Sequence, residues 1–195
     1  GMEIANRSYS VLIVSSSHEA GESVRAMIPQ NRCCPVKIAS DGAGARRLLL
    51  EGTFDIVIIN TPLKDGFGTR LALDISDGGS TCVMLLVKAE HYEEINARIS
   101  PYGVLTVSKP TTRQIMSSAV DLLCGTRERL RRMEQKTASV EEKMEEIRIV
   151  NKAKWLLIDQ LKMTEHQAHR YIEKQAMDRC VTKRAVAENI LSTYK

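Results

Sequence analysis

Asn60 is the residue that most directly limits the chemistry of this chain. It ends the apolar run Ile56-Val57-Ile58-Ile59 and is soon followed by Leu63-Lys64-Asp65-Gly66. A later apolar run ends at Lys109-Pro110. A carboxylate at position 60 could accept a phosphoryl group, whereas the neutral amide of asparagine cannot act as that nucleophile. The sequence therefore predicts that this position carries out no phosphoryl transfer.

The rest of the sequence offers no other reactive arrangement. It contains no nucleophile–base pair and no glycine-rich phosphate loop. His166 and His169 lie three residues apart on one predicted helix, but no third metal ligand accompanies them. The five cysteines have no C-x-x-C spacing, and we expect reduced thiols at Cys33, Cys34, Cys82, Cys124 and Cys180. We therefore expect no enzymatic activity, no cofactor and no metal.

Charge separates the two halves of the chain. Residues 1–125 carry 12 Lys and Arg against 13 Asp and Glu, whereas residues 126–195 carry 16 against 11. The basic half is the better candidate to bind a polyanion, although a solvated charged surface explains the same excess. The sequence contains neither an apolar stretch long enough to span a membrane nor a secretory signal, so we expect a cytoplasmic protein.

Short apolar runs alternate with helical patterns in the first part of the chain. Apolar runs in a row suggest a parallel sheet covered on both faces, and five strand–helix units fit a flavodoxin-like, doubly wound order. We thus predict an α/β fold. The predicted strands are 11–14, 36–39, 56–59, 82–87 and 104–107, and the predicted helices are 19–28, 42–51, 69–75, 91–99 and 113–123.

A heptad pattern follows this region. Spacings of alternately three and four residues connect Leu123, Thr126, Leu130, Met133, Thr137, Val140, Met144 and Ile147. We interpret the pattern as a two-stranded coiled coil whose dimer seam is Leu123, Leu130, Met133, Val140, Met144 and Ile147. A single amphipathic helix lying on its own domain is the alternative. Gly125 lowers helix propensity and is predicted to mark a flexible joint between domain and coil.

The last part of the chain predicts a small three-helix domain. Its first helix continues from the coil through Ala153, Leu157 and Leu161. The segment Thr164-Glu165-His166-Gln167 matches a capping box and predicts a new helix there. Thr182 is the expected N-cap of the last helix.

Residues 8–124 resemble the receiver domain of bacterial response regulators, through the run ending at Asn60 and the Lys109-Pro110 pair. In that family, acids after the first strand hold a magnesium ion; Ser15 and Ser16 stand there in this chain, and hydroxyls are poor substitutes. The family's hydroxyl residue after the fourth strand falls near Val87 or Lys88, which lack one. The resemblance implies a pseudo-receiver in which Lys109 lies near Asn60 and can hydrogen-bond its amide oxygen.

Two uses remain open for such a pseudo-receiver. We expect a scaffold or protein-binding domain that is not phosphorylated. A small-ligand sensor in the former phosphorylation site is the alternative.

Residues 140–193 resemble the ANTAR domain of bacterial antitermination regulators. The resemblance rests on Ala153-Lys154-Trp155-Leu156-Leu157, Met163-Thr164-Glu165-His166-Gln167-Ala168, Gln175-Ala176-Met177-Asp178-Arg179 and Val186-Ala187-Glu188-Asn189-Ile190, after Ile147-Arg148. It implies binding to RNA hairpins in nascent transcripts, which prevents terminator formation. Cations hold an RNA backbone, and aromatic rings stack on unpaired bases. The candidate RNA-binding residues are Lys152, Lys154, Arg170, Tyr171, Lys174, Arg179, Lys183 and Arg184, with His169 as a further donor.

Trp155 departs from this family, which usually has glycine after the Ala-Lys pair. We prefer a packed core tryptophan at this position. An exposed ring that stacks on a base is the alternative.

The predicted organisation is a pseudo-receiver (8–124), a coiled-coil linker (125–150) and an ANTAR-like domain (151–195) whose first helix continues the coil. We expect a homodimer that regulates transcription antitermination, either constitutively dimeric or controlled by a partner protein. A DNA-binding response regulator and a protein-interaction adaptor without nucleic acid are the alternatives.

Overall fold

The structure is a computed structural model that describes residues 7–194; Lys195, the last residue of the predicted C-terminal domain, lies outside the described residues. The chain divides into two compact units, residues 1–132 and residues 133–195. Each unit is described by itself, because the helix α6 (Arg113–Leu161) contributes residues to both.

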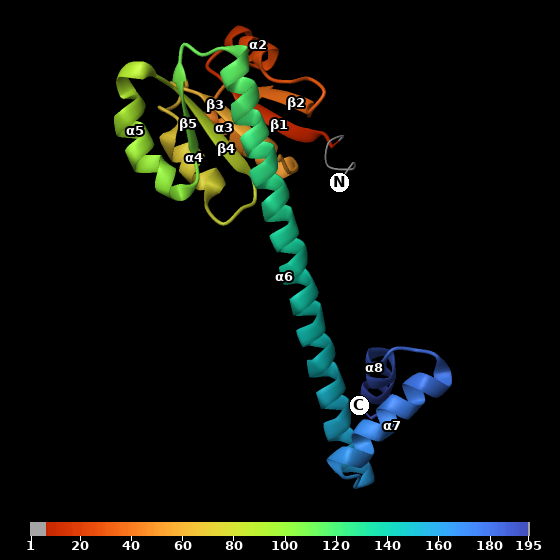
Figure 1. The fold of residues 1–195 in the computed structure, drawn as a ribbon. Helices are drawn as coiled ribbons and strands as arrows, with labels where there is room; N and C mark the ends of the chain where they lie inside the picture. Colours follow the sequence, from red (N-terminus) through yellow and green to blue (C-terminus); the bar gives the residue numbers. More distant parts are fainter. Residues whose placement is uncertain (1–6, 195) are drawn as a thin grey trace. The chain divides into compact units, whose positions relative to one another are not determined.

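The first unit contains a five-stranded, entirely parallel sheet (Figure 1). Its strands are β1 (Tyr9–Val14), β2 (Cys33–Ala39), β3 (Ile56–Asn60), β4 (Cys82–Lys88) and β5 (Leu105–Lys109). Their order is β2-β1-β3-β4-β5. This order confirms the predicted flavodoxin-like, doubly wound fold. Strand β2 starts three residues before the predicted run, because Cys33 opens its pairing with Tyr9.

Helices cover both faces of this sheet. The helices are α2 (His18–Met27), α3 (Gly42–Glu51), α4 (Thr69–Ser76), α5 (Tyr92–Ile99) and the start of α6, with the short 3₁₀ segments η1 (Ala89–His91) and η2 (Ser100–Tyr102). One core cluster packs α2 and α6 on the sheet, and a second packs α3, α4 and α5 on the other face. Side chains alternate between the two clusters along each strand, with Ile13 in one and Leu12 in the other.

Helix α6 continues without a break through Gly125, so the predicted flexible joint there is wrong. The helix is held on both sides of that glycine by residues of unit 1. Leu123 and Cys124 are buried in the core cluster under α6, and Leu130 packs partly against the same cluster. Leu123 is therefore not available to a dimer seam, contrary to the prediction, and Leu130 is only partly exposed.

A buried carboxylate fixes the next turn of α6. Glu128 accepts hydrogen bonds from Arg7 Nη1 (2.8 Å), Tyr9 Oη (2.7 Å) and Arg131 Nη1 (2.8 Å). Burial alone would raise the pKa of Glu128, but the Tyr9 hydroxyl and the two arginine charges together lower it. Burial, reinforced by the bond to Glu128, raises the pKa of Tyr9 to about 12.

A second carboxylate at the amino edge of the sheet completes this arrangement. Asp55 accepts bonds from Arg127 Nε (3.0 Å), Arg131 Nη2 (3.1 Å) and the backbone amide of Ser10 (3.0 Å). We refer to the residues around Glu128 and Asp55 as the charge clamp. Because the buried Glu128 and the half-buried Asp55 each accept bonds from several donors, the clamp fixes residues 127–131 of α6 to strand β1 and to the residue that precedes β3.

The second unit consists of the end of α6, helix α7 (Glu165–Arg179) and helix α8 (Lys183–Thr193). These helices pack around an aliphatic core, confirming the predicted small three-helix domain. The core is made of Ile149, Ala153, Leu157, Ala168, Ile172, Ala176, Val186, Ala187 and Ile190.

Local capping signals set the limits of these helices. Thr164 and Gln167 form the predicted capping box at the start of α7, with reciprocal bonds of 2.9 and 3.1 Å. Cys180 ends α7 in the left-handed conformation at φ 53°. Thr182 caps α8 by accepting a hydrogen bond from the Ala185 amide.

Candidate nucleic-acid interface and the altered phosphorylation site

The carboxyl edge of the sheet brings Ser15, Asn60 and Lys109 together. Asn60 Nδ2 donates to Ser15 Oγ (3.2 Å), and Lys109 Nζ donates to Asn60 Oδ1 (2.9 Å). Lys109 Nζ also donates to the carbonyl oxygen of Thr61. The hydrogen bond expected between Lys109 and Asn60 is therefore present, and the side-chain amide of Asn60 donates and accepts within this group.

The other predicted positions at this edge contribute no acidic group. Ser15 is fully buried and Ser16 is half-buried. Val87 is buried in the core with α3, α4 and α5, whereas Lys88 is exposed. Burial, together with the charge of Lys88, lowers the pKa of Lys109. An excess of positive charge and an amide thus stand where a metal-dependent phosphorylation site needs carboxylates.

Asp65 is the carboxylate that follows Asn60 in the sequence, but it is engaged elsewhere. Its oxygens accept hydrogen bonds from the backbone amides of Gly42 (2.8 Å) and Ala43 (3.0 Å) at the start of α3. These bonds lower the pKa of Asp65. Asp65 therefore caps the amino end of α3, where a negative charge interacts favourably with the helix dipole.

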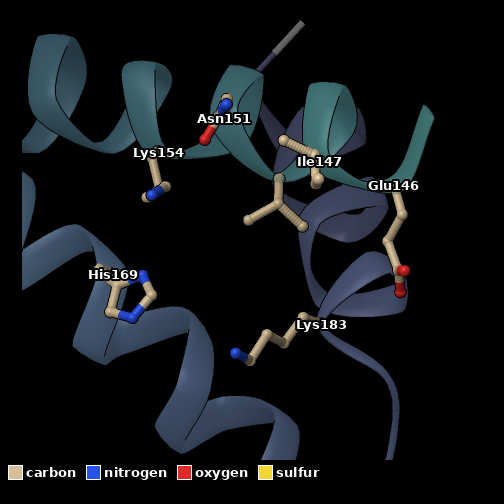
Figure 2. Close-up of a pocket in the computed structure, with 7 residues that line it drawn as sticks. Glu146, Ile147, Asn151, Lys154, His169 and Lys183 are labelled. Atoms are coloured by element: carbon tan, nitrogen blue, oxygen red, sulfur yellow. The ribbon is translucent and has the colours of Figure 1, made fainter. Parts of the chain in front are cut away.

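Three helices of the second unit contribute to one cavity of about 390 Å³. Lys154 from α6, His169 from α7 and Lys183 from α8 point into the space between the helices (Figure 2). Ile147 and Asn151 lie on the α6 side of this space, and Val150 and Glu146 complete the lining. We call this space the cationic cavity. Donors from three helices at one cavity suit an anionic ligand, although Glu146 also lines it.

Glu173 links two of these donors. Its Oε1 lies 2.9 Å from His169 Nε2 and 3.4 Å from Lys183 Nζ. The charge of His169 is the main cause that lowers the pKa of Glu173. This glutamate was not among the predicted residues, although its i+4 spacing from His169 on one helix could have revealed it. Glu173 therefore already partners both donors.

Another side of α7 carries a second group of predicted RNA-binding residues. Arg170, Tyr171 and Lys174 line a surface cavity of about 600 Å³, together with the exposed Met177. Tyr171 is 39% exposed, so part of this residue is accessible to a ligand. Cations beside an accessible ring suit a flexible nucleic-acid strand, in which backbone and bases are both reachable.

The remaining predicted cations are not gathered at these cavities. Lys152 and Arg179 are exposed, and neither lines the two cavities described above. Arg184 Nε donates to Glu188 Oε1 (3.1 Å) within α8. Their contribution to RNA binding stays a prediction.

Trp155 is 65% exposed, so the preferred prediction of a core tryptophan is wrong. Ala153 and Leu157 of the same helix face the core. Successive residues of an α-helix are turned by about 100°. A residue midway between two core positions therefore points away from the core.

A family model for the ANTAR domain matches residues 138–191, which include the three core-forming segments and both cavities. Residues 138–191 are an ANTAR domain. The chain is also similar to the transcriptional regulatory protein PdtaR of Mycobacterium tuberculosis, with 26% identity over 155 residues. That alignment covers 80% of this chain and 76% of PdtaR, so it extends well beyond the ANTAR domain.

The fold of the first unit is that of a receiver. It is similar to the receiver domain of an HD domain-containing protein from Pseudomonas fluorescens Pf-5, with TM-score 0.57 and 22% identity, over 65% of this chain and 93% of that chain. It is also similar to the chemotaxis response regulator CheY4 of Vibrio cholerae, with TM-score 0.52 and 17% identity, over 60% of this chain and 98% of that chain. The chain thus joins a receiver fold to an ANTAR domain, as predicted.

Residues 7–194 show neither a membrane span nor a metal-binding cluster. These residues contain no helix that is both long and apolar enough to cross a membrane. They also contain no group of three or more His, Cys, Asp or Glu side chains that could hold a metal ion.

Proposed function

We propose that this protein binds RNA hairpins through its ANTAR domain and thereby regulates transcription antitermination in the cytoplasm, without catalysis. The observation that supports the proposal most is the convergence of Lys154, His169 and Lys183 on one cavity of the ANTAR domain. A single cation on a helix surface is commonly solvated, but donors from three helices at one cavity can bind a phosphate together.

In this proposal, the two cavities bind different parts of the RNA. The cationic cavity takes a backbone phosphate, which supplies affinity that depends on salt but not on sequence. The α7 surface around Tyr171 takes an unpaired base, since unpaired loop bases can stack on aromatic rings. A loop offers both groups, whereas a regular duplex keeps its bases stacked.

The receiver-fold unit acts in this proposal as a scaffold that is not phosphorylated at residue 60. The amide of Asn60 cannot accept a phosphoryl group, and its hydrogen bonds to Ser15 and Lys109 occupy the site. Incubation with acetyl phosphate and Mg²⁺ tests this: we expect no added phosphoryl mass, and a stable adduct on residue 60 would overturn it.

A homodimer completes the proposal. The predicted seam retains an exposed part, in which Met133, Val140, Met144 and Ile147 are each more than half exposed. Two ANTAR domains in one dimer can bind two loops of one transcript, and the second contact then becomes effectively intramolecular. Without a phosphorylation input, association is constitutive or controlled by a partner protein.

The deciding experiment compares binding of hairpin RNA and duplex DNA across a salt series. We expect the intact chain to prefer hairpin RNA. The double variant Lys154→Ala and Lys183→Ala should weaken binding and flatten the plot of log affinity against log salt by about 0.7 to 0.9 per lost phosphate contact. Lys37→Ala, which removes an exposed lysine from the first unit, is the control and should leave the slope unchanged. Preference for duplex DNA, or no nucleic-acid binding at all, would overturn the proposal.

A substitution at Glu173 should change the affinity for hairpin RNA in the opposite direction, towards tighter binding. Glu173→Gln removes the carboxylate that competes for His169 and Lys183. We expect this variant to bind hairpin RNA several-fold more tightly than the wild type at low salt, where charge effects are largest. A weaker affinity would show that Glu173 positions the donors instead of competing with the phosphate.

A further inference from the structure

Trp155 is a large aromatic side chain that belongs neither to the core nor to the cavities of the second unit. It is the single tryptophan of the chain and is 65% exposed on α6. Ala153 and Leu157 of the same helix face the core, and the ring lines neither the cationic cavity nor the cavity beside Tyr171. An indole ring buries a large apolar area when it is covered, so its exposure leaves that area available to a ligand.

The exposed neighbours of this ring are polar. Residues three and four positions apart are neighbours on the surface of an α-helix. Asn151 and Lys152 precede Trp155 at this spacing and are exposed, and Asp159 follows it and is also exposed. Ile158, the remaining neighbour, packs against the core of the second unit. The ring therefore stands among polar groups, which suits a ligand that carries charge as well as an apolar face.

Asn151 connects the ring to the cationic cavity. It lines that cavity together with Lys154, and both residues belong to α6 (Figure 2). Asn151 lies four residues before Trp155, and Lys154 is the residue directly before it, so the ring and the cavity adjoin on one helix. A chain molecule with one group in the cavity can therefore place its next group on the ring.

Cations lie on both sides of the ring. Successive residues of an α-helix are turned by about 100°, so Lys154 lies about 100° to one side of Trp155, and Lys152 lies about 60° to the other side. Asp159 places a carboxylate one turn after the ring. A polyanion is therefore favoured over the amino side of Trp155, where the two lysines lie, and disfavoured over its carboxyl side.

We propose that Trp155 stacks on an unpaired base of the hairpin loop, next to the phosphate in the cationic cavity, and that Lys152 contacts the phosphate on the other side of that base. This inference rests on the RNA binding of the proposed function and deepens it, because it adds a base-stacking residue on α6 to the contacts of the two cavities. The base at Trp155 is a second one, since Tyr171 belongs to α7.

The surroundings of the ring favour RNA over a protein as the ligand. An aromatic ring beside cations binds single-stranded nucleic acid, because every base has a face that can stack and the cations hold the backbone. A protein that covered the ring would also bury Lys152 and Asp159, and burying a charge costs free energy unless it finds a partner. Because a duplex keeps its bases stacked on one another, this contact selects loops.

The fluorescence of Trp155 reports this contact directly, because the chain has no other tryptophan. Stacking on a nucleobase quenches the emission of an indole ring. We expect hairpin RNA to quench the emission of the full chain in step with binding measured on labelled RNA. The matched control is the same stem with an abasic loop, which keeps the phosphates and removes the bases. At saturation, this control RNA should leave the emission unchanged.

Substitutions separate the ring from the charge beside it. Trp155→Ala should weaken hairpin binding by about tenfold, and the plot of log affinity against log salt should keep its slope because the ring carries no charge. Trp155→Phe should restore part of the affinity. Lys152→Ala should flatten the slope by about 0.7 to 0.9. Leu50→Ala, which truncates an apolar side chain that is 89% exposed in the first unit, is the control and should change neither affinity nor slope.

Unchanged emission at saturating hairpin RNA, equal quenching by the abasic-loop RNA, or wild-type affinity in Trp155→Ala would overturn the inference. A lower mass of Trp155→Ala in sedimentation at the assay concentration would also overturn it, because the ring would then act through a protein contact. Failure of the proposed function is distinguishable. A chain that binds no hairpin RNA refutes both proposals, whereas a chain that binds hairpin RNA, loses affinity in the Lys154 and Lys183 double variant and shows no quenching refutes the contact of Trp155 alone.

Discussion

Replacing Asn60 by aspartate restores the residue type that a phosphorylatable receiver would use. In the native chain, Lys109 Nζ lies 2.9 Å from Asn60 Oδ1, and Asn60 Nδ2 lies 3.2 Å from Ser15 Oγ. With Asn60→Asp, the first contact becomes an ion pair. The hydroxyl of Ser15 can turn to donate to the new carboxylate, because a hydroxyl both donates and accepts.

The expected change in the free energy of unfolding is the balance of two opposing effects, the attraction between the charges and the cost of removing the carboxylate from water. An ion pair at about 4 Å is worth about 4 kcal/mol at the effective dielectric of a site near the protein surface. Removing a carboxylate from water costs several kcal/mol, but this site is only half-buried and offers two donors. The balance is a gain of about 1 kcal/mol in the free energy of unfolding near neutral pH, or roughly 2–4 °C in the melting temperature of a chain of this size.

The gain should depend on pH in a defined direction. The ammonium of Lys109 holds the pKa of the introduced carboxyl below its unfolded value of about 3.9. The extra stability is therefore fully present above that value and is lost as the pH falls through the folded pKa. Unfolding by urea at pH 7 and at pH 3 measures the difference between the variant and the wild type.

A double-mutant cycle identifies the cause. In the background Lys109→Met, the Asn60→Asp substitution should bring no gain, because its partner is missing. A gain that survives in this background, or a variant that is less stable than the wild type at neutral pH, would refute the argument. The same variant should still not be phosphorylated by acetyl phosphate with Mg²⁺, because Ser15 and Ser16 give the metal hydroxyls in place of carboxylates. A stable phosphoryl adduct would contradict that part.

Three further substitutions test the structure elsewhere. Glu128→Gln should lower the free energy of unfolding at pH 7 by about 1–3 kcal/mol, and the difference from the wild type should shrink as the pH falls below the lowered pKa of Glu128, as urea titrations would show. Thr164→Ala removes the capping box and should cost about 1 kcal/mol, seen as lower helix content by circular dichroism on heating. Leu157→Ala opens the core of the second unit and should cost about 2–5 kcal/mol in chemical unfolding, whereas Leu161→Ala, at a position that is 48% exposed, should cost far less.

The sequence was a good guide where the signal is local. Each predicted strand and helix of the first unit is present, because apolar runs and helical spacing follow directly from burial on a two-sided sheet. The ends differ by a few residues, except that the helix predicted over 113–123 continues to Leu161. The caps at Thr164 and Thr182 were also predictable, since a cap depends on side chains within three residues of the helix start.

The sequence was a poor guide to the exposure of residues on a helix, because that exposure depends on which side of the helix the rest of the chain covers. The heptad pattern treats Leu123 and Met133 alike, yet the first is buried against the sheet and the second is exposed. Gly125 suggested a joint because glycine lowers helix propensity, but the buried contacts of Leu123 and Glu128 on either side outweigh that local cost.

What the amino-acid sequence alone determined is the class of the molecule: a five-stranded α/β unit without a phosphate acceptor, followed by a long helix and a small helical unit with the ANTAR pattern. What only the tertiary structure decided is which side chains meet. Lys154, His169 and Lys183 are far apart in the chain, and three packed helices bring them to one cavity. Trp155 is exposed because Ala153 and Leu157 turn the opposite side of α6 to the core. Both outcomes depend on how helices rotate against a shared core, and spacing along one helix cannot supply that information.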